Sequence, residues 1–143
     1  MDEQDVLISV YQNTQTAMQS INDLIKKTDD KTFKDLLNAQ YKRYEDFNNK
    51  VEDYAKNNGI ELKDNNWFEK AKMWSSIQMG TLTDSSTRHL AELMLVGTVM
   101  GTLTCYKAID DYSKAPKEAT MLLKELEQME EDNFNELKKY LKK

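Results

Sequence analysis

The sequence predicts an all-α protein, a bundle of four helices arranged as two antiparallel hairpins joined by one long crossover. Three observations support this fold. The 143 residues include only four glycines and one proline, so little interrupts helix formation. Four long stretches repeat apolar residues at steps of three and four, the spacing of one helix face. A connection of about 28 residues, near 57–84, is far too long for a hairpin between neighbouring helices.

The first hairpin is expected to contain helices over about 2–27 and 31–57. The first helix carries an apolar stripe from Leu7 to Ile25, and the second carries one from Phe33 to Ala55. Thr28, Asp29 and Asp30 offer N-caps for the second helix, and Gly59 suits a left-handed end. The turn between these helices is short, so we expect them to be antiparallel neighbours.

The crossover is expected to contain a short extra helix over Trp67–Met79, on the outside of the bundle. A third long helix then begins near Ser85, capped by Thr83, Asp84 or Ser85, and runs to about Tyr112. Pro116 fits the first turn of a fourth helix, which continues nearly to the last residue. Residues 1–143 together are expected to form a single domain.

The third helix differs from the others because its middle is apolar in nearly every direction, from Leu93 to Ile109. Each helix of a lone four-helix bundle has an outer face, so an all-round apolar helix requires a further cover. The crossover helix with its two tryptophans and a second copy of the protein are the two candidates. The residues expected at an interface with a second copy are Leu95, Val96, Val99 and Leu103.

Charge and composition restrict the classes of partner. The net charge is −5 with acidic and basic residues interspersed, so no clustered basic face is present for nucleic acid. No run approaches the roughly 18 apolar residues that a membrane helix needs. The acidic N-terminus does not resemble a signal peptide, and the single Cys105 permits no intrachain disulfide. We therefore expect a cytoplasmic protein, without nucleic-acid or membrane partners, that forms a homodimer or binds another protein.

Polar residues at inward positions predict a polar layer inside the bundle. Such residues must form hydrogen bonds with one another or with the backbone when they are buried. They could instead line a small ligand pocket beneath Tyr44. The polar-layer residues are Thr14, Gln40, Tyr44, Thr104 and Asn133.

Gly97 and Gly101 lie four residues apart in the third helix, a spacing that allows close approach of a neighbour. The register places both inward, so we expect them to make room for a large side chain such as Tyr44 or Trp74. A ligand or a partner approaching the backbone is the alternative.

In its plan of hairpin, crossover and hairpin, the chain resembles the ferritin-like superfamily. Members of that superfamily that bind two metals place one Glu on each of two helices and Glu-x-x-His on the others. Here the sequence reads Glu-x-x-Asn at 45–48 and 130–133, and Asn is a poor ligand for iron or zinc. The remaining metal candidates are Glu45, Glu130 and Glu92; His89 is expected at the surface or an interface. The resemblance therefore implies the fold without its di-metal centre, and no cofactor is expected.

Within that superfamily, the chain is similar to small bacterial bundles that lack metal ligands and to spore coat F-type proteins of Gram-positive bacteria. The similarity lies in the stretches 7–25, 36–54 and 88–101. It implies a structural or protein-interaction role, with a spore or stress context, and no catalysis. One His, one Cys and no glycine-rich phosphate loop likewise offer little for an enzyme. The hypothesis is a non-enzymatic, self-associating bundle; the alternatives are a degenerate metal-binding protein and a small-ligand binder.

Overall fold

The computed structural model describes residues 3–62, 84–111 and 117–142, with the backbone alone for 108–111. This part of the chain is helical, and none of its residues belongs to a strand. Its elements are α1 (Glu3–Ile25), α2 (Lys31–Asn57), α4 (Thr87–Asp111), α5 (Lys117–Lys138) and the 3-10 helix η1 (Lys139–Lys142). The prediction of an all-α bundle with four long helices is confirmed. The short helix expected over Trp67–Met79 and the turn at Pro116 lie outside the described residues.

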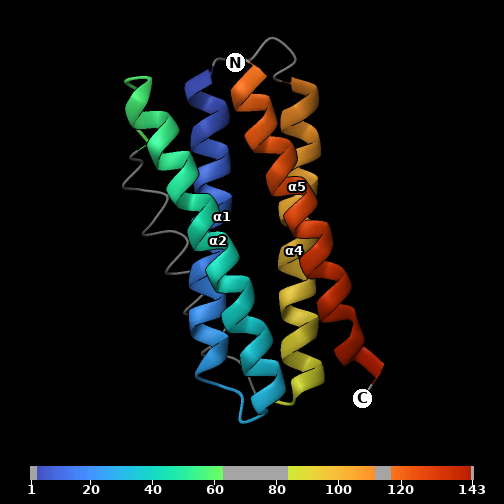
Figure 1. The fold of residues 1–143 in the computed structure, drawn as a ribbon. Coiled ribbons are helices and arrows are strands. Elements are labelled where there is room, and N and C mark those ends of the chain that lie inside the picture. Colours follow the sequence, from blue (N-terminus) through green and yellow to red (C-terminus); the bar gives the residue numbers. More distant parts are fainter. Residues whose placement is uncertain (1–2, 63–83, 112–116, 143) are drawn as a thin grey trace.

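The four helices form two antiparallel pairs (Figure 1). α1 packs against α2 and α4 packs against α5, and these are the two most extensive contacts between elements. α2 and α4 run in the same direction, so the end of α2 and the beginning of α4 lie at opposite ends of the bundle. α1 also contacts α4 and α5, which joins the two pairs.

The ends of α2 follow the local rules of helix capping. The Asp30 side chain accepts a hydrogen bond from the backbone N–H of Phe33 at 3.0 Å, so Asp30 is the N-cap among the expected residues. Gly59 has a φ of 64°, and Ile60 N–H donates back to the carbonyl of Ala55 at 2.8 Å. This is the Schellman arrangement, which requires the left-handed residue that glycine supplies at low cost.

The beginning of α4 differs from the expectation. Its N-cap is Ser86, whose Oγ accepts from the N–H of His89 at 3.3 Å, and not Thr83, Asp84 or Ser85. Asp84 instead accepts from the N–H of Ser86 and so orders the residues that precede the cap. Because Thr87 Oγ1 donates to Asp30 Oδ2 at 3.1 Å, the first turns of α2 and α4 are held together.

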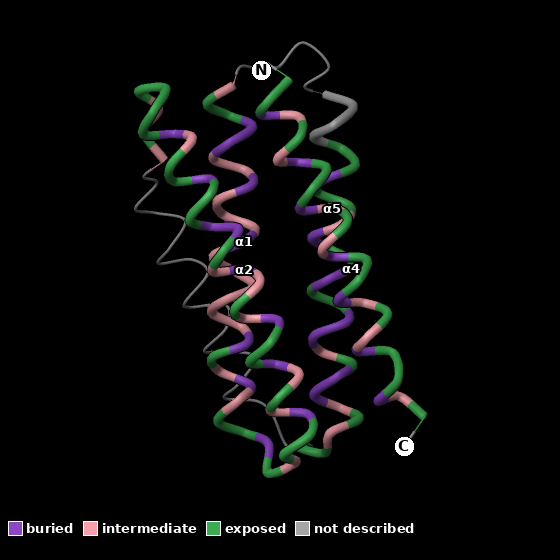
Figure 2. The backbone as a smooth tube through the Cα atoms, in the orientation of Figure 1, coloured by how far each residue is buried: buried purple, intermediate pink, exposed green. Residues whose placement is uncertain are grey.

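The core is the set of apolar faces that the helices turn toward one another (Figure 2). At one end of the bundle, the rings of Phe33 and Tyr140 pack edge to face with centroids 5.1 Å apart, which ties η1 to the start of α2. Of the described helices, none combines the length and the apolar character needed to cross a membrane.

Candidate functional site

The outward face of α4 carries a row of large apolar side chains that are accessible to solvent. The exposed fractions are 59% for Val96, 42% for Val99, 57% for Met100, 52% for Leu103 and 48% for Tyr106. We call these five residues the α4 stripe. A row of this size is unusual on the surface of a helix whose other face is already buried, and such rows mark contact surfaces.

The α4 stripe has the spacing of a helix–helix seam. Val96 and Leu103 are seven residues apart, as are Val99 and Tyr106, which is the heptad repeat of the a and d positions of a coiled coil. The opposite face of α4 is the buried one; it carries Leu90, Ala91, Met94, Thr98, Gly101 and Cys105. α4 therefore has two apolar faces, one in the core and one outward, and this accounts for its all-round apolar sequence.

Three of the four residues expected at an interface belong to the α4 stripe, and Leu95 does not. Leu95 is only 7% exposed and lies in the core. Successive residues of an α-helix are rotated by about 100° about its axis, so Leu95, the residue before the exposed Val96, lies on the buried side. The assignment of Leu95 to an outward interface was wrong for this reason.

A groove between α4 and α5 widens the apolar surface at the α4 stripe. Its volume is about 290 Å³, and Val99 and Leu103 form one wall while Phe134 lies on the α5 side. Charged residues stand beyond both ends of the stripe, with Glu92 on one side and Lys107 on the other, both exposed.

The interior contains four of the five residues expected in a polar layer. Thr14, Gln40, Tyr44 and Asn133 are all buried. Thr104 is exposed and donates to the carbonyl of Met100 on its own helix, so its placement in the interior was wrong. The inward face of α4 passes through Gly101 and Cys105, which leaves Thr104 on the outer side.

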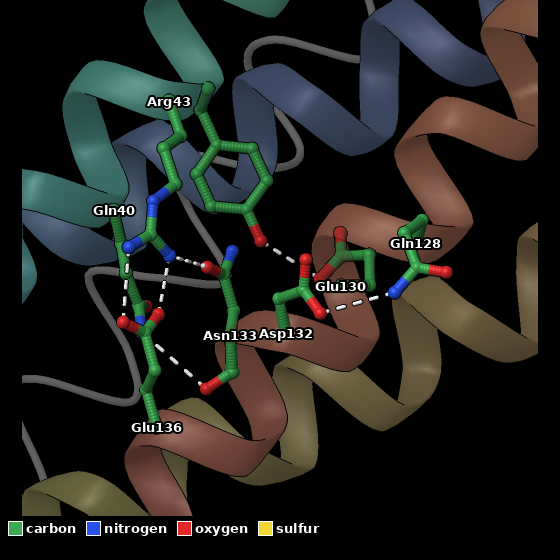
Figure 3. Close-up of polar contacts among 8 residues, drawn as sticks. Gln40, Arg43, Gln128, Glu130, Asp132, Asn133 and Glu136 are labelled. Carbon is green, nitrogen blue, oxygen red and sulfur yellow. Dashed lines mark hydrogen bonds and ion pairs between the residues drawn. The ribbon is translucent and has the colours of Figure 1, made fainter.

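The buried polar side chains do not form one continuous layer. Thr14 donates to the carbonyl of Val10 within α1, while Gln40 Nε2 lies 3.4 Å from the carbonyl oxygen of Asn133. Tyr44 donates its hydroxyl proton to Glu130 at 2.8 Å. Figure 3 shows that the contacts of Gln40 and Glu130 lie in two neighbouring parts of the α2 and α5 interface.

Glu130 is the most unusual residue in the interior, because its carboxyl group is buried and only 1% of the residue is exposed. Burial raises the pKa of this carboxyl to about 7, and the hydrogen bond from Tyr44 opposes part of that rise. The phenol of Tyr44 is affected in turn, since burial and the neighbouring carboxylate raise its pKa well above the ordinary value.

Gly101 on α4 leaves the space that Glu130 occupies together with Asn13 of α1. A Cβ atom at Gly101 would lie 2.9 Å from Asn13 Oδ1 and 3.0 Å from Glu130 Oε1. The nearest described groups at Gly101 are polar, so the prediction that this glycine makes room for Tyr44 is not supported, and Trp74 lies outside the described residues. Gly97 is exposed, and a Cβ there would meet nothing within 4 Å among the described residues, so its inward placement was wrong.

A second polar cluster lies one turn further along α5, where Arg43 of α2 binds Glu136 through both guanidinium Nη atoms, one of them at 3.0 Å. Arg43 also donates to Asn133 Oδ1 at 2.9 Å (Figure 3). The guanidinium holds the pKa of Glu136 below its usual range, mainly through these hydrogen bonds. This cluster links α2 to α5, the pair of helices that otherwise has few contacts.

Replacing Arg43 by lysine is expected to lower the free energy of unfolding by about 1 kcal/mol, because an ammonium cannot reproduce the two-pronged contact and the bond to Asn133. Chemical denaturation at fixed protein concentration measures this. Lys42→Ala is the control, since the ion pairs of Lys42 with described residues are the exposed ones with Glu45 and Asp46 on its own helix. An Arg43→Lys variant no less stable than Lys42→Ala would contradict the role assigned to the cluster.

The three metal candidates are not brought together. Glu45 is paired with Lys42 at the surface, and Glu92 is paired there with Arg88 and His89. Only Glu130 points into the bundle. Across the described ranges, no three His, Cys, Asp or Glu side chains are grouped so that they could hold a metal ion.

A larger groove of about 790 Å³ lies between α2 and α5, but it is open to the surface and Tyr44 does not line it. Its floor contains Phe47 and Met129, and its rim is charged, with Lys50 and Glu125 paired across it at 2.7 Å. The ligand pocket considered beneath Tyr44 stays a prediction, and the Glu130 carboxyl occupies the space at the Tyr44 hydroxyl.

Sequence reasoning missed Asn13, Arg43 and Glu136 as members of the interior clusters. Arg43 and Glu136 lie one position before Tyr44 and one before Leu137, at the edge of each inward stripe. A charged residue at the edge of a stripe on each of two facing helices is the signal that could have indicated the pair. Comparison with protein-family models, curated proteins and solved structures gave no match for this chain.

Proposed function

We propose that this protein is a structural or protein-interaction module that associates with a second copy of itself through the α4 stripe. The observation that carries the proposal is the exposed heptad row of Val96, Val99, Leu103 and Tyr106 on the face of α4 opposite the core. An amphipathic seam of this kind is stabilised when another helix covers it. The proposal includes a ferritin-like bundle plan, supported by the parallel course of α2 and α4, without a di-metal centre.

A second copy fits the α4 stripe because the stripe is self-complementary. In a closed dimer with two-fold symmetry, the same surface patch faces itself in opposite directions. With the axis between Val99 and Met100, Val96 faces Leu103 of the second copy and Val99 faces its Met100. Leu93, which is half-buried, then lies beside Tyr106 of the second copy.

The charges at the ends of the stripe favour the same antiparallel register. The axis between Val99 and Met100 places Glu92 of each copy opposite Lys107 of the other, so each dimer gains two pairs of opposite charge. A parallel arrangement would instead place like charges together, which costs free energy. Apolar contact at the centre and charge pairing at the rim is the usual anatomy of a protein interface.

The test is sedimentation of the full chain at micromolar concentrations. We expect a dimer, and we expect Leu103→Glu to be monomeric with unchanged helicity, because two carboxylates would be desolvated in the seam. Met121→Glu is the matched control, since Met121 on α5 is also 59% exposed but lies outside the α4 stripe. A wild-type monomer at these concentrations would contradict the proposal.

Charge reversal tests the register of the dimer. Glu92→Lys and Lys107→Glu are each expected to weaken association about tenfold, and the double variant is expected to recover it, because the antiparallel pairs are restored with exchanged signs. If the double variant is as weak as the single ones, the antiparallel register is wrong even where the dimer itself is present.

A further inference from the structure

A buried carboxyl group at the centre of the bundle faces a fixed acceptor. The amide of Asn13 is oriented by its Nδ2, which donates to the carbonyl of Gly101 at 3.2 Å and lies 3.9 Å from Cys105 Sγ. Its Oδ1 is therefore turned toward the space beside Gly101. Glu130 Oε1 reaches the same space, and the two oxygens lie within 2.9 and 3.0 Å of one point there.

The other oxygen of Glu130 already has a donor. Glu130 Oε2 accepts the hydroxyl proton of Tyr44 from α2. Asn13 Nδ2, 3.3 Å from that same point, is directed to the Gly101 carbonyl, so an ionised Glu130 would leave two acceptors, its Oε1 and Asn13 Oδ1, facing one space. A proton on Oε1 would turn it into a donor toward Asn13 Oδ1, and the carboxylic acid would then connect α1, α2 and α5.

We propose that Glu130 is a proton-binding switch in the bundle interior, which holds α1 against α5 when it is protonated and releases the Asn13 contact when it ionises. The proposal does not depend on self-association, because every residue in it lies in the interior of one chain. It adds a control by pH near neutrality to the proposed interaction module.

The groups around Glu130 leave it as the one that titrates near neutral pH. Tyr44 faces it from α2 and Cys105 faces it from α4, and burial together with nearby carboxylates raises the pKa of the Cys105 thiol to about 12. Glu127, one turn earlier on α5, acts on Cys105 as well. Asn13, the facing residue of α1, carries no charge. Among the described residues, no cation contributes to the pKa of Glu130, whose causes are burial and the Tyr44 hydroxyl.

The test is carbon-13 NMR of the full chain labelled in the glutamate carboxyl groups, in buffer with chelator. We expect one carboxyl to titrate near pH 7, to disappear in Glu130→Gln and to remain in Glu131→Gln, an exposed neighbour. We expect Tyr44→Phe to raise the titration midpoint of the Glu130 carboxyl by more than half a pH unit. The Tyr44 hydroxyl donates a hydrogen bond that favours the ionised carboxylate, and the variant removes this donor. The protection of α1 backbone amides near Asn13 against hydrogen exchange should fall as the Glu130 carboxyl ionises. In Glu130→Gln this protection should not change with pH in the same way.

Four results would overturn the proposal. The first is a Glu130 carboxyl that titrates near its ordinary value. The second is a Glu130 midpoint that is unchanged in a folded Tyr44→Phe variant. The third is protection of α1 amides that follows pH equally in Glu130→Gln. The fourth is a Glu130 midpoint that drops when magnesium, manganese or zinc replaces the chelator, because the carboxylate would then bind a metal and not a proton.

Discussion

Replacing Glu130 by glutamine is expected to make the protein more stable above pH 7, by about 3 kcal/mol. The pKa of Glu130 is raised from an ordinary 4.5 to about 7 in the folded protein, and each pH unit of such a difference corresponds to about 1.4 kcal/mol. Glutamine keeps the shape of the side chain and carries no charge to desolvate. Its oxygen can accept from Tyr44 while its amide donates toward Asn13.

The sign of the effect follows from which state binds the proton. Between pH 4.5 and 7 the folded protein holds the proton on Glu130 while the unfolded chain has lost it, so stability falls as the pH rises. Below pH 4.5 both states are protonated, and wild type and Glu130→Gln should be similar. Above pH 7 both states are ionised and the full cost of the buried charge is present.

Denaturant titrations from pH 4 to 8, at one protein concentration, measure this difference. The control is Glu131→Gln, because Glu131 is exposed and its hydrogen bond among the described residues is with the exposed Tyr106 of the α4 stripe, so its stability curve should follow that of wild type. If Glu130→Gln and wild type give parallel curves across this range, Glu130 is not a buried acid with a raised pKa.

Local sequence rules were sufficient for most of the fold. The expected bounds of α2 agree with the structure, and Asp30 and Gly59 perform the expected roles at its ends. The signals there are strong because caps and left-handed turns depend on a few neighbouring residues. The same rules placed the cap of α4 up to three residues too early, since Thr83, Asp84, Ser85 and Ser86 are all acceptable caps and the sequence does not distinguish them.

The faces of α4 could not be assigned from the sequence for a physical reason. A helix with one apolar stripe reveals which side is buried, but α4 has a second stripe outward, so periodicity favours no single direction. Gly97 and Thr104 were consequently placed inward and Leu95 outward, and all three assignments were wrong. The rotation of α4 about its axis is decided by its packing against α1 and α5.

The interior clusters were only partly predictable because each of them joins different helices. Burial of Gln40, Tyr44 and Asn133 follows from their register, but their partners depend on how far α2 and α5 are shifted along each other. Glu130 was expected only as a metal candidate and not in the polar layer, since a carboxylate inside a bundle costs free energy unless a donor reaches it. Tyr44 supplies that donor, and no local pattern in α5 indicates it.

The two glycines of α4 offer a direct comparison of an interior and a surface position. Gly101→Val is expected to destabilise the protein by about 2 kcal/mol, because its Cβ would already lie 2.9 Å from Asn13 Oδ1 and 3.0 Å from Glu130 Oε1. Its methyl groups would then displace the polar ends of both side chains. Helix propensity offsets part of this loss of stability, because valine favours a helix more than glycine does by a few tenths of a kcal/mol.

Gly97→Val is the matched variant, because the same residue type enters the same helix one turn earlier, where a Cβ meets no described atom within 4 Å. We expect its stability to be equal to or slightly above that of wild type. The difference between the two variants cancels helix propensity and isolates the packing at Gly101. Denaturation at one protein concentration measures it, and the carboxyl titration of Glu130 should change only in Gly101→Val. Equal stability of the two variants would mean that the space beside Gly101 is not filled by Asn13 and Glu130.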